Sequence, residues 1–203
     1  MRALVLVDLQ YDFLPGGALA VADGDHTLAV ARKLMPKFDI VVATQDWHPQ
    51  EHGSFAVNNP GSAPFQQGEL NGLPQTMWPA HCVQNTTGAE LHESLERGRI
   101  THVFHKGTDA TIDSYSGFYD NGHRKSTGLA DWLRAREIDQ LYVLGLATDY
   151  CVKFTALDAR SEGFDVWLIE DGCRGVNLAP DDSDKAIAEM RAAGVTIVTS
   201  GDL

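Results

Sequence analysis

The chain has 203 residues, of which 43% are apolar and 22% charged, and this suits one folded domain with a well-filled hydrophobic core. Its 28 acidic residues outnumber its 16 basic residues, the formal net charge is −12, and no lysine and arginine stripe could bind phosphates. Nucleic acids and anionic membrane surfaces are therefore poor candidate partners. Because no apolar stretch reaches the ~20 residues of a membrane span and the N-terminus enters a strand-like run directly, we expect a cytoplasmic protein.

Short β-rich runs alternate with segments of helical spacing along the chain. The runs cover residues 3–7, 40–44, 100–105, 141–146, 166–169 and 195–198, and the helical segments cover 26–35, 88–97, 127–136, 149–162 and 183–193. Uniformly apolar runs suit strands covered on both faces, as in a parallel sheet. We predict an α/β fold, a three-layer sandwich with a central parallel sheet of about six strands flanked by helices, forming a single domain over residues 1–203.

The first strand-like run ends at Asp8, the third at Lys106, and the fourth closely precedes Cys151. If these runs are neighbouring parallel strands, a carboxylate, an ammonium and a thiol meet at one edge of the sheet. A buried carboxylate is costly unless it is paired, which favours a functional or ion-paired role for Asp8. This combination is typical of a cysteine hydrolase.

Cys151 precedes an apolar-periodic segment, so we expect it in the first turn of a helix. Unpaired N–H groups there favour a thiolate and could bind an oxyanion. On position alone, an inert buried cysteine is an equal alternative. Three cysteines do not make a disulfide framework, and we expect Cys82 and Cys173 to be structural.

Residues 45–87 form an irregular region, and long loops within a compact domain are usually functional. Asp46 and His48 are two residues apart and share one face of an extended chain, while His52 and His81 follow later. Imidazoles with a carboxylate suit a divalent ion, with zinc first and iron or manganese as alternatives. We predict a metal- and substrate-binding region here, although any one of these histidines alone would suit a solvated loop.

Three aromatic residues outside the helical segments, Phe13, Trp78 and Tyr115, are candidate walls for a flat aromatic substrate. Asp12 is expected to cap a turn or to face solvent. The other five histidines are not recruited to the site.

Seven motifs, in order across nearly the whole chain, closely resemble those of nicotinamidases in the isochorismatase-like hydrolase superfamily. They are VLVDLQYDF at 5–13, TQDWHP at 44–49, HGSFA at 52–56, WPAHCVQ at 78–84, HKG at 105–107, DSYSGF at 113–118 and GLATDYCV at 145–152. The resemblance implies that Asp8, Lys106 and Cys151 form the catalytic triad and that Asp46, His48 and His81 bind the metal.

The resemblance also implies that His52 and Ser54 lie where related enzymes use either a direct ligand or water. It further implies a cis peptide bond between Leu146 and Ala147, with the N–H groups of Ala147 and Cys151 forming the oxyanion hole. The implied reaction converts nicotinamide to nicotinate and ammonia through a cysteine thioester, with pyrazinamide as a plausible second substrate. The question whether the chain forms a homo-oligomer is left open.

Two alternatives compete with this reading. A metal-independent superfamily member, such as an isochorismatase, a carbamoyl amide hydrolase or a ureidoacrylate amidohydrolase, would resemble the triad but lack the Asp-x-His pattern with a later histidine. A non-enzymatic α/β domain that binds a nucleotide or flavin is disfavoured, because no glycine-rich phosphate loop follows the first strand.

Overall fold

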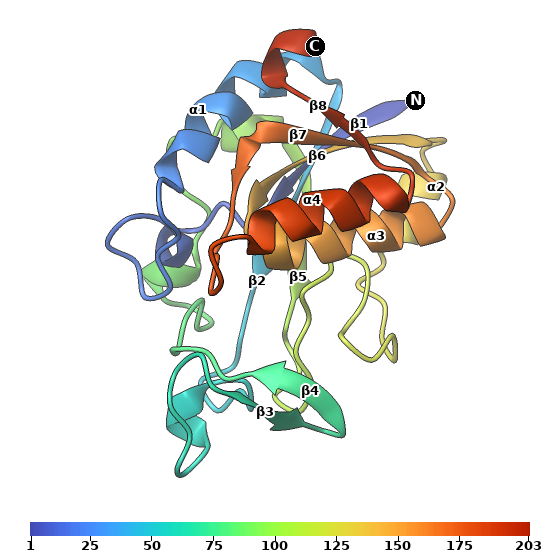
Figure 1. Cartoon of the computed structure of the whole chain (residues 1–203). Coiled ribbons are helices and arrows are strands. Elements are labelled where there is room, and N and C mark those ends of the chain that lie inside the picture. The colour runs from blue at the N-terminus through green and yellow to red at the C-terminus, as the bar shows by residue number, and fades with distance from the viewer.

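The computed structural model describes all 203 residues and places a six-stranded sheet at the centre of the molecule (Figure 1). The strands are β1 (Arg2–Val7), β2 (Ile40–Asp46), β5 (Ile100–Lys106), β6 (Gln140–Leu146), β7 (Asp165–Arg174) and β8 (Thr196–Val198). They lie in the order β5-β2-β1-β6-β7-β8, and every neighbouring pair is parallel. The predicted parallel sheet of about six strands is therefore confirmed.

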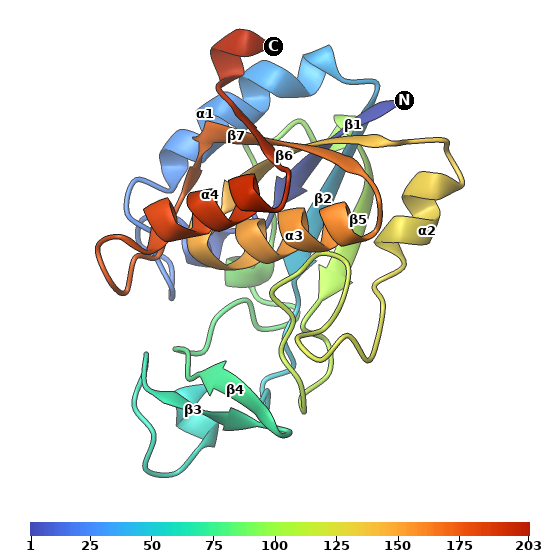
Figure 2. The ribbon, with the colours of Figure 1, turned by 45° about the vertical axis from the view of Figure 1, so that its right-hand side comes forward.

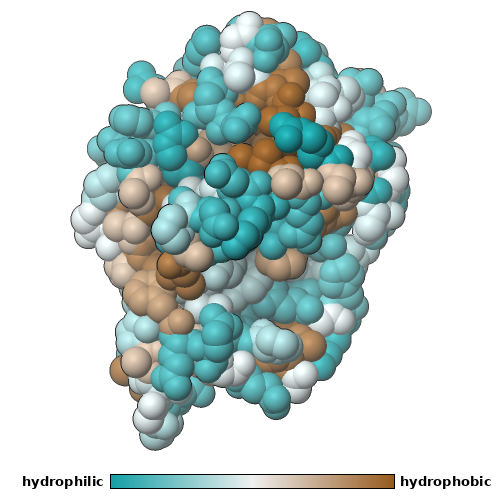
Figure 3. All heavy atoms as spheres, viewed as in Figure 1, coloured by the Kyte–Doolittle hydropathy of each residue, from teal (hydrophilic) through white to brown (hydrophobic).

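Helices cover both faces of this sheet (Figures 1 and 2). Helix α1 (Asp25–Leu34) packs on one face against β6 and β7, while α3 (Lys153–Ser161) and α4 (Asp182–Ala192) lie side by side on the other. Because both faces are covered, residues 3–7 of β1 are completely buried. The outward side of α4 is largely hydrophilic (Figure 3).

The remaining helix, α2 (Leu129–Arg134), lies beside the edge strand β5. The ring of Trp132 stacks on that of His102, with 5.7 Å between the ring centroids. None of the helices combines the length and the apolar content that a membrane crossing requires.

One predicted helix, over residues 88–97, does not form. This segment runs in an irregular, partly extended course between two short 3₁₀ turns. The N–H of Tyr11 donates to the carbonyl of Glu90, and the N–H of His92 donates to the carbonyl of Leu9. The helix prediction was wrong because the segment makes hydrogen bonds with the chain that follows β1 instead of within itself.

The irregular region contains a hairpin that the sequence analysis missed, formed by β3 (Gln67–Leu70) and β4 (Leu73–Thr76). The turn residues Asn71 and Gly72 both have positive φ, 53° and 80°, as a two-residue hairpin turn requires. The hairpin is part of a lobe reached from the carboxyl end of β2 (Figure 2). An Asn-Gly pair is a recognised hairpin signal, so this hairpin could have been predicted from the sequence.

Candidate active site

Four polar residues meet at the carboxyl edge of the sheet. Asp8 follows β1, Asp46 ends β2, Lys106 ends β5, and Cys151 lies shortly after β6. The convergence was predicted on the condition that the strands are neighbours; β1 and β6 are adjacent, whereas β2 lies between β1 and β5. Lys106 therefore extends past the end of β2 to reach Asp8.

The Lys106 ammonium is the centre of this group. Its Nζ lies 2.9 Å from Oδ2 of Asp8 and 3.4 Å from Sγ of Cys151, and it also contacts Oδ1 of Asp46. A further hydrogen bond of 3.0 Å goes to the carbonyl of Ser114. The side chains of Asp8, Asp46, Lys106 and Cys151 are all buried. The structure thus brings together the three residues predicted as a triad and links them to a predicted metal ligand.

Burial and charge set the protonation states of this group. Burial raises the pKa of Asp8, although the positive charge of Lys106 opposes this effect. Burial also raises the pKa of the Cys151 thiol well above its usual range. Burial disfavours the Lys106 ammonium, but Asp46 and Asp8 together raise the Lys106 pKa well above its usual range. The amine therefore stays charged, while the thiol keeps a proton that a neighbouring base has to remove.

Thr44 orients the Asp8 carboxylate. Its hydroxyl donates to Oδ1 of Asp8 over 2.6 Å, and this leaves Oδ2 facing Lys106. Both side chains are fully buried. Thr44 was not predicted from the sequence, although its position in β2, two residues before Asp46, was an available signal.

Cys151 lies in a π-helical turn over Thr148–Val152, and α3 begins directly afterwards. The helix predicted over residues 149–162 thus has an irregular first turn. The peptide bond between Leu146 and Ala147 is cis, as the resemblance implied. Ala147 and Cys151 both line the same small cavity.

This cavity is mostly apolar, and it is lined by Cys151 of the triad and by two of the predicted metal ligands, Asp46 and His81. Phe13, Trp78 and Tyr115, the three aromatic residues predicted as substrate walls, all line it. Nε1 of Trp78 donates to the Tyr115 hydroxyl over 3.2 Å. The cavity therefore presents flat aromatic surfaces next to the thiol.

Four further lining residues were missed from the sequence: Leu19, Asp113, Tyr150 and Val176. Tyr150 precedes Cys151 directly, which was an available signal. No sequence signal pointed to Val176, because it comes from the loop after β7. The carboxylate of Asp149 holds that loop by accepting the N–H groups of Val176, at 2.9 Å, and Asn177, at 2.7 Å.

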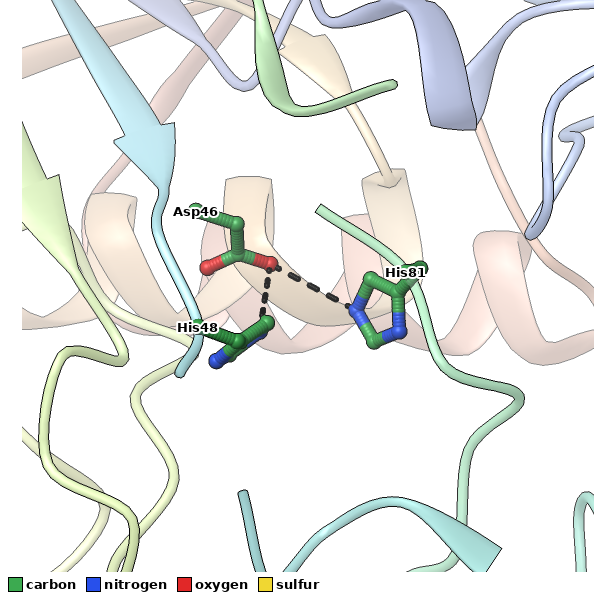
Figure 4. Close-up of side chains that lie close together, drawn as sticks. All are labelled: Asp46, His48 and His81. Carbon is green, nitrogen blue, oxygen red and sulfur yellow. Dashed lines mark ion pairs between the residues drawn. The ribbon is translucent and has the colours of Figure 1, made fainter. Parts of the chain in front are cut away.

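The predicted metal ligands Asp46, His48 and His81 converge beside the cavity (Figure 4). Oδ2 of Asp46 lies 3.4 Å from Nε2 of His48 and 3.7 Å from Nε2 of His81. One ligand atom from each residue lies within 4.8 Å of the other two, and all three residues are buried.

Hydrogen bonds at the far side of each imidazole test whether these residues fit a metal ion. Nδ1 of His48 lies 2.9 Å from the carbonyl of Gly107, and Nδ1 of His81 lies 2.8 Å from the carbonyl of Pro79. Since a carbonyl can only accept, each Nδ1 carries a proton, and each Nε2 of a neutral ring offers a lone pair. When both rings are neutral, two imidazole nitrogens and a carboxylate oxygen face one another in this buried site, and such a donor set fits a divalent metal ion.

His52 and Ser54 lie next to this triplet and bond to each other. Nδ1 of His52 lies 2.8 Å from Oγ of Ser54, while Nε2 of His52 is buried without a hydrogen-bond partner in the protein. The His52 ring is 4.3 Å from that of His48. Burial, aided by the neighbouring His48, lowers the pKa of His52 to about 4, which keeps its ring neutral near pH 7.

Comparison with known proteins places this arrangement in a family. The isochorismatase domain model matches residues 2–202. The nicotinamidase of Escherichia coli K12 is 57% identical over 205 residues, which cover 99% of this chain and 96% of that protein.

Two solved structures extend the comparison to three dimensions. A nicotinamidase/pyrazinamidase of Acinetobacter baumanii superimposes with a TM-score of 0.96 at 46% identity, covering 99% of this chain and 97% of that one. The pyrazinamidase of Pyrococcus horikoshii, in complex with zinc, has a TM-score of 0.78 at 37% identity, covering 98% of each chain. The resemblance drawn from the motifs is thereby confirmed, and the chain belongs to the isochorismatase family.

Proposed function

We propose that this chain is a metal-dependent nicotinamidase that hydrolyses nicotinamide to nicotinate and ammonia through a cysteine thioester. The observation that carries the proposal is the buried Lys106 ammonium, 2.9 Å from Asp8 and 3.4 Å from the Cys151 sulfur, beside an aromatic cavity. The 57% identity to the nicotinamidase of Escherichia coli over 99% of the chain supports the same substrate. In this proposal residues 1–203 form one domain, and residues 45–87 supply all three of its metal ligands.

The first half of the reaction forms the thioester. Asp8 accepts the proton of the Cys151 thiol, and the sulfur attacks the carboxamide carbon of nicotinamide. The N–H groups of Ala147 and Cys151 bind the oxyanion of the tetrahedral intermediate. Asp8 then returns the proton to the leaving nitrogen, the C–N bond breaks, and ammonia departs.

The second half hydrolyses the thioester. Asp8, now a carboxylate again, accepts a proton from a water molecule that attacks the thioester carbon. Collapse of this intermediate breaks the C–S bond, Asp8 returns its proton to the sulfur, and the nicotinic acid product loses its remaining acidic proton to solvent and leaves as nicotinate. Lys106 stays charged throughout and stabilises whichever of Asp8 and Cys151 is anionic.

Asp46, His48 and His81 hold the metal ion in this proposal, and zinc is the ion proposed on the strength of their ligand types and the zinc-bound relative. When bound, the ion supplies a Lewis acid for the pyridine nitrogen, directly or through water, and so orients the ring. Phe13, Trp78 and Tyr115 enclose the ring, and the similar ring of pyrazinamide suits the same walls. The buried triplet disfavours a metal-independent member of the family.

An ammonia-release assay tests the proposal. The metal-loaded protein should release ammonia from nicotinamide, lose this activity when a chelator removes the metal, and regain it when Zn²⁺ is restored. Benzamide, which has the same carboxamide but no ring nitrogen, is the matched control substrate and should be a much poorer one. Equal turnover of the two amides, or full activity in protein shown to be free of metal, would refute the proposal.

A further inference from the structure

Gln10 is completely buried although its side chain is polar, and it lies two residues after Asp8. Its carboxamide pairs with the backbone of Asp46 on both sides. Nε2 donates to the Asp46 carbonyl over 2.8 Å, and Oε1 accepts the Asp46 N–H over 2.8 Å. The side chain thus bonds both backbone groups of Asp46, as a neighbouring strand would, at the last residue of β2.

A third hydrogen bond fixes the orientation of this carboxamide. Nε2 of Gln10 also donates to the carbonyl of Ala89 over 2.7 Å. Both hydrogens of the amide nitrogen are therefore used, and the amide cannot rotate without leaving buried groups unpaired. The backbone of Asp46 is held in one position relative to β1.

Asp12, in the same segment, makes a comparable contact beside His81. Its Oδ2 accepts the N–H of Cys82 over 2.7 Å. Cys82 follows His81 directly and has a positive φ of 47°, a conformation that non-glycine residues adopt only when the surroundings enforce it. Asp12 was expected to cap a turn or to face solvent; one group that its carboxylate satisfies is the N–H of the residue that follows a predicted metal ligand.

We propose that Gln10 and Asp12 are positioning residues for the metal centre, holding the backbones at Asp46 and His81 so that their ligand atoms face the same point. The inference rests on the proposed metal site. Partners that orient metal ligands without touching the metal typically change metal affinity by ~10- to 100-fold. One short segment after β1 would therefore carry the base Asp8 and fix two of the three metal ligands.

Metal affinity tests this directly, without reference to turnover. Wild-type protein is stripped with a chelator and titrated with Co²⁺, and binding is followed by the visible absorption of the bound ion. Gln10→Met removes all three hydrogen bonds at similar volume, and Asp12→Ala removes the acceptor for Cys82. Each variant should raise the Kd for Co²⁺ by ~10- to 100-fold, while its far-ultraviolet circular dichroism spectrum stays that of wild type.

Gln45→Ala is the matched control. Gln45 is also buried, and its Nε2 donates to the same Ala89 carbonyl over 2.6 Å, but its side chain makes no hydrogen bond to the Asp46 backbone. It should leave the Co²⁺ Kd within about threefold of wild type, below the range expected for partners of metal ligands. Asp12→Asn keeps an acceptor oxygen and should bind Co²⁺ more tightly than Asp12→Ala.

The outcomes separate the inference from the function beneath it. If wild type binds Co²⁺ and Gln10→Met binds it equally well, the role of Gln10 is overturned. If Asp12→Asn and Asp12→Ala lose Co²⁺ affinity to the same extent, the role of the Asp12 hydrogen bond is overturned. If Gln10→Met does not fold, Gln10→Glu replaces it, and unchanged affinity in that variant has the same meaning. A wild-type protein that binds no Co²⁺ overturns the metal centre itself.

Discussion

Replacing Lys106 with methionine should destabilise the protein strongly. Lys106 is fully buried and contacts two buried carboxylates, that of Asp8 at 2.9 Å and that of Asp46. Methionine fills similar space but has no charge, so both carboxylates lose their cation. Breaking a buried ion pair by removing one partner costs roughly 3–5 kcal/mol. For a chain of this size, this corresponds to a fall in Tm of roughly 6–20 °C.

The loss should depend on pH in a defined direction. Burial already raises the pKa of Asp8, and loss of the Lys106 charge raises it further. A carboxyl group whose pKa is higher in the folded than in the unfolded state favours folding at pH values below its unfolded pKa, about 3.9 for aspartate. That contribution disappears as pH rises through the folded pKa. The gap in Tm between Lys106→Met and wild type should therefore be wide near pH 7 and narrower near pH 4.

Thermal unfolding of chelator-treated proteins measures this effect without any contribution from a bound metal. Lys185→Met is the matched control, because Lys185 forms an exposed ion pair with Asp181 and should leave Tm unchanged within error. Adding Asp8→Asn to Lys106→Met removes one of the two uncompensated buried charges and should restore part of the lost stability. A Lys106→Met protein that melts within about 2 °C of wild type at pH 7 would show that the two buried carboxylates do not depend on the Lys106 charge.

Three further predictions follow from the site and the core. His81→Ala should lose the bound metal and at least ~100-fold in ammonia release while the protein stays folded; metal analysis checks this, and a full metal complement would contradict it. Trp78→Ala removes a buried cavity wall, so the KM for nicotinamide should rise roughly tenfold, a loss of about 1.4 kcal/mol of binding, and an unchanged KM would count against the assigned pocket. Leu4→Ala, in the fully buried strand β1, should lower the free energy of unfolding by about 2–5 kcal/mol in urea titrations without changing the KM; a loss under about 1 kcal/mol would contradict the packing described.

The fold was predictable because its strongest signals are local. The uniformly apolar run at residues 3–7 indicated a strand covered on both faces, and β1 lies in the interior of the sheet. Helix spacing at residues 88–97 was misleading, because hydrogen bonds to the chain after β1 compete with the helix there. Such competition depends on tertiary structure, which a single sequence does not contain.

The convergence of the site was also predictable in part. The triad of Asp8, Lys106 and Cys151 could be predicted because the carboxyl ends of parallel strands lie at one edge of the sheet. The motifs then indicated the metal ligands beside it. The orienting groups were harder to find. Gln10 and Thr44 look like ordinary polar residues in the sequence, and only the register of β1 against β2 places them on Asp46 and Asp8.

The proposed reaction depends on the Cys151 sulfur as its nucleophile. Ammonia release by Cys151→Ala, measured together with the metal content of the variant, tests this role. We expect a folded protein that keeps its metal and releases ammonia from nicotinamide at least ~1,000-fold more slowly than wild type. A metal-loaded Cys151→Ala protein with wild-type turnover would contradict it.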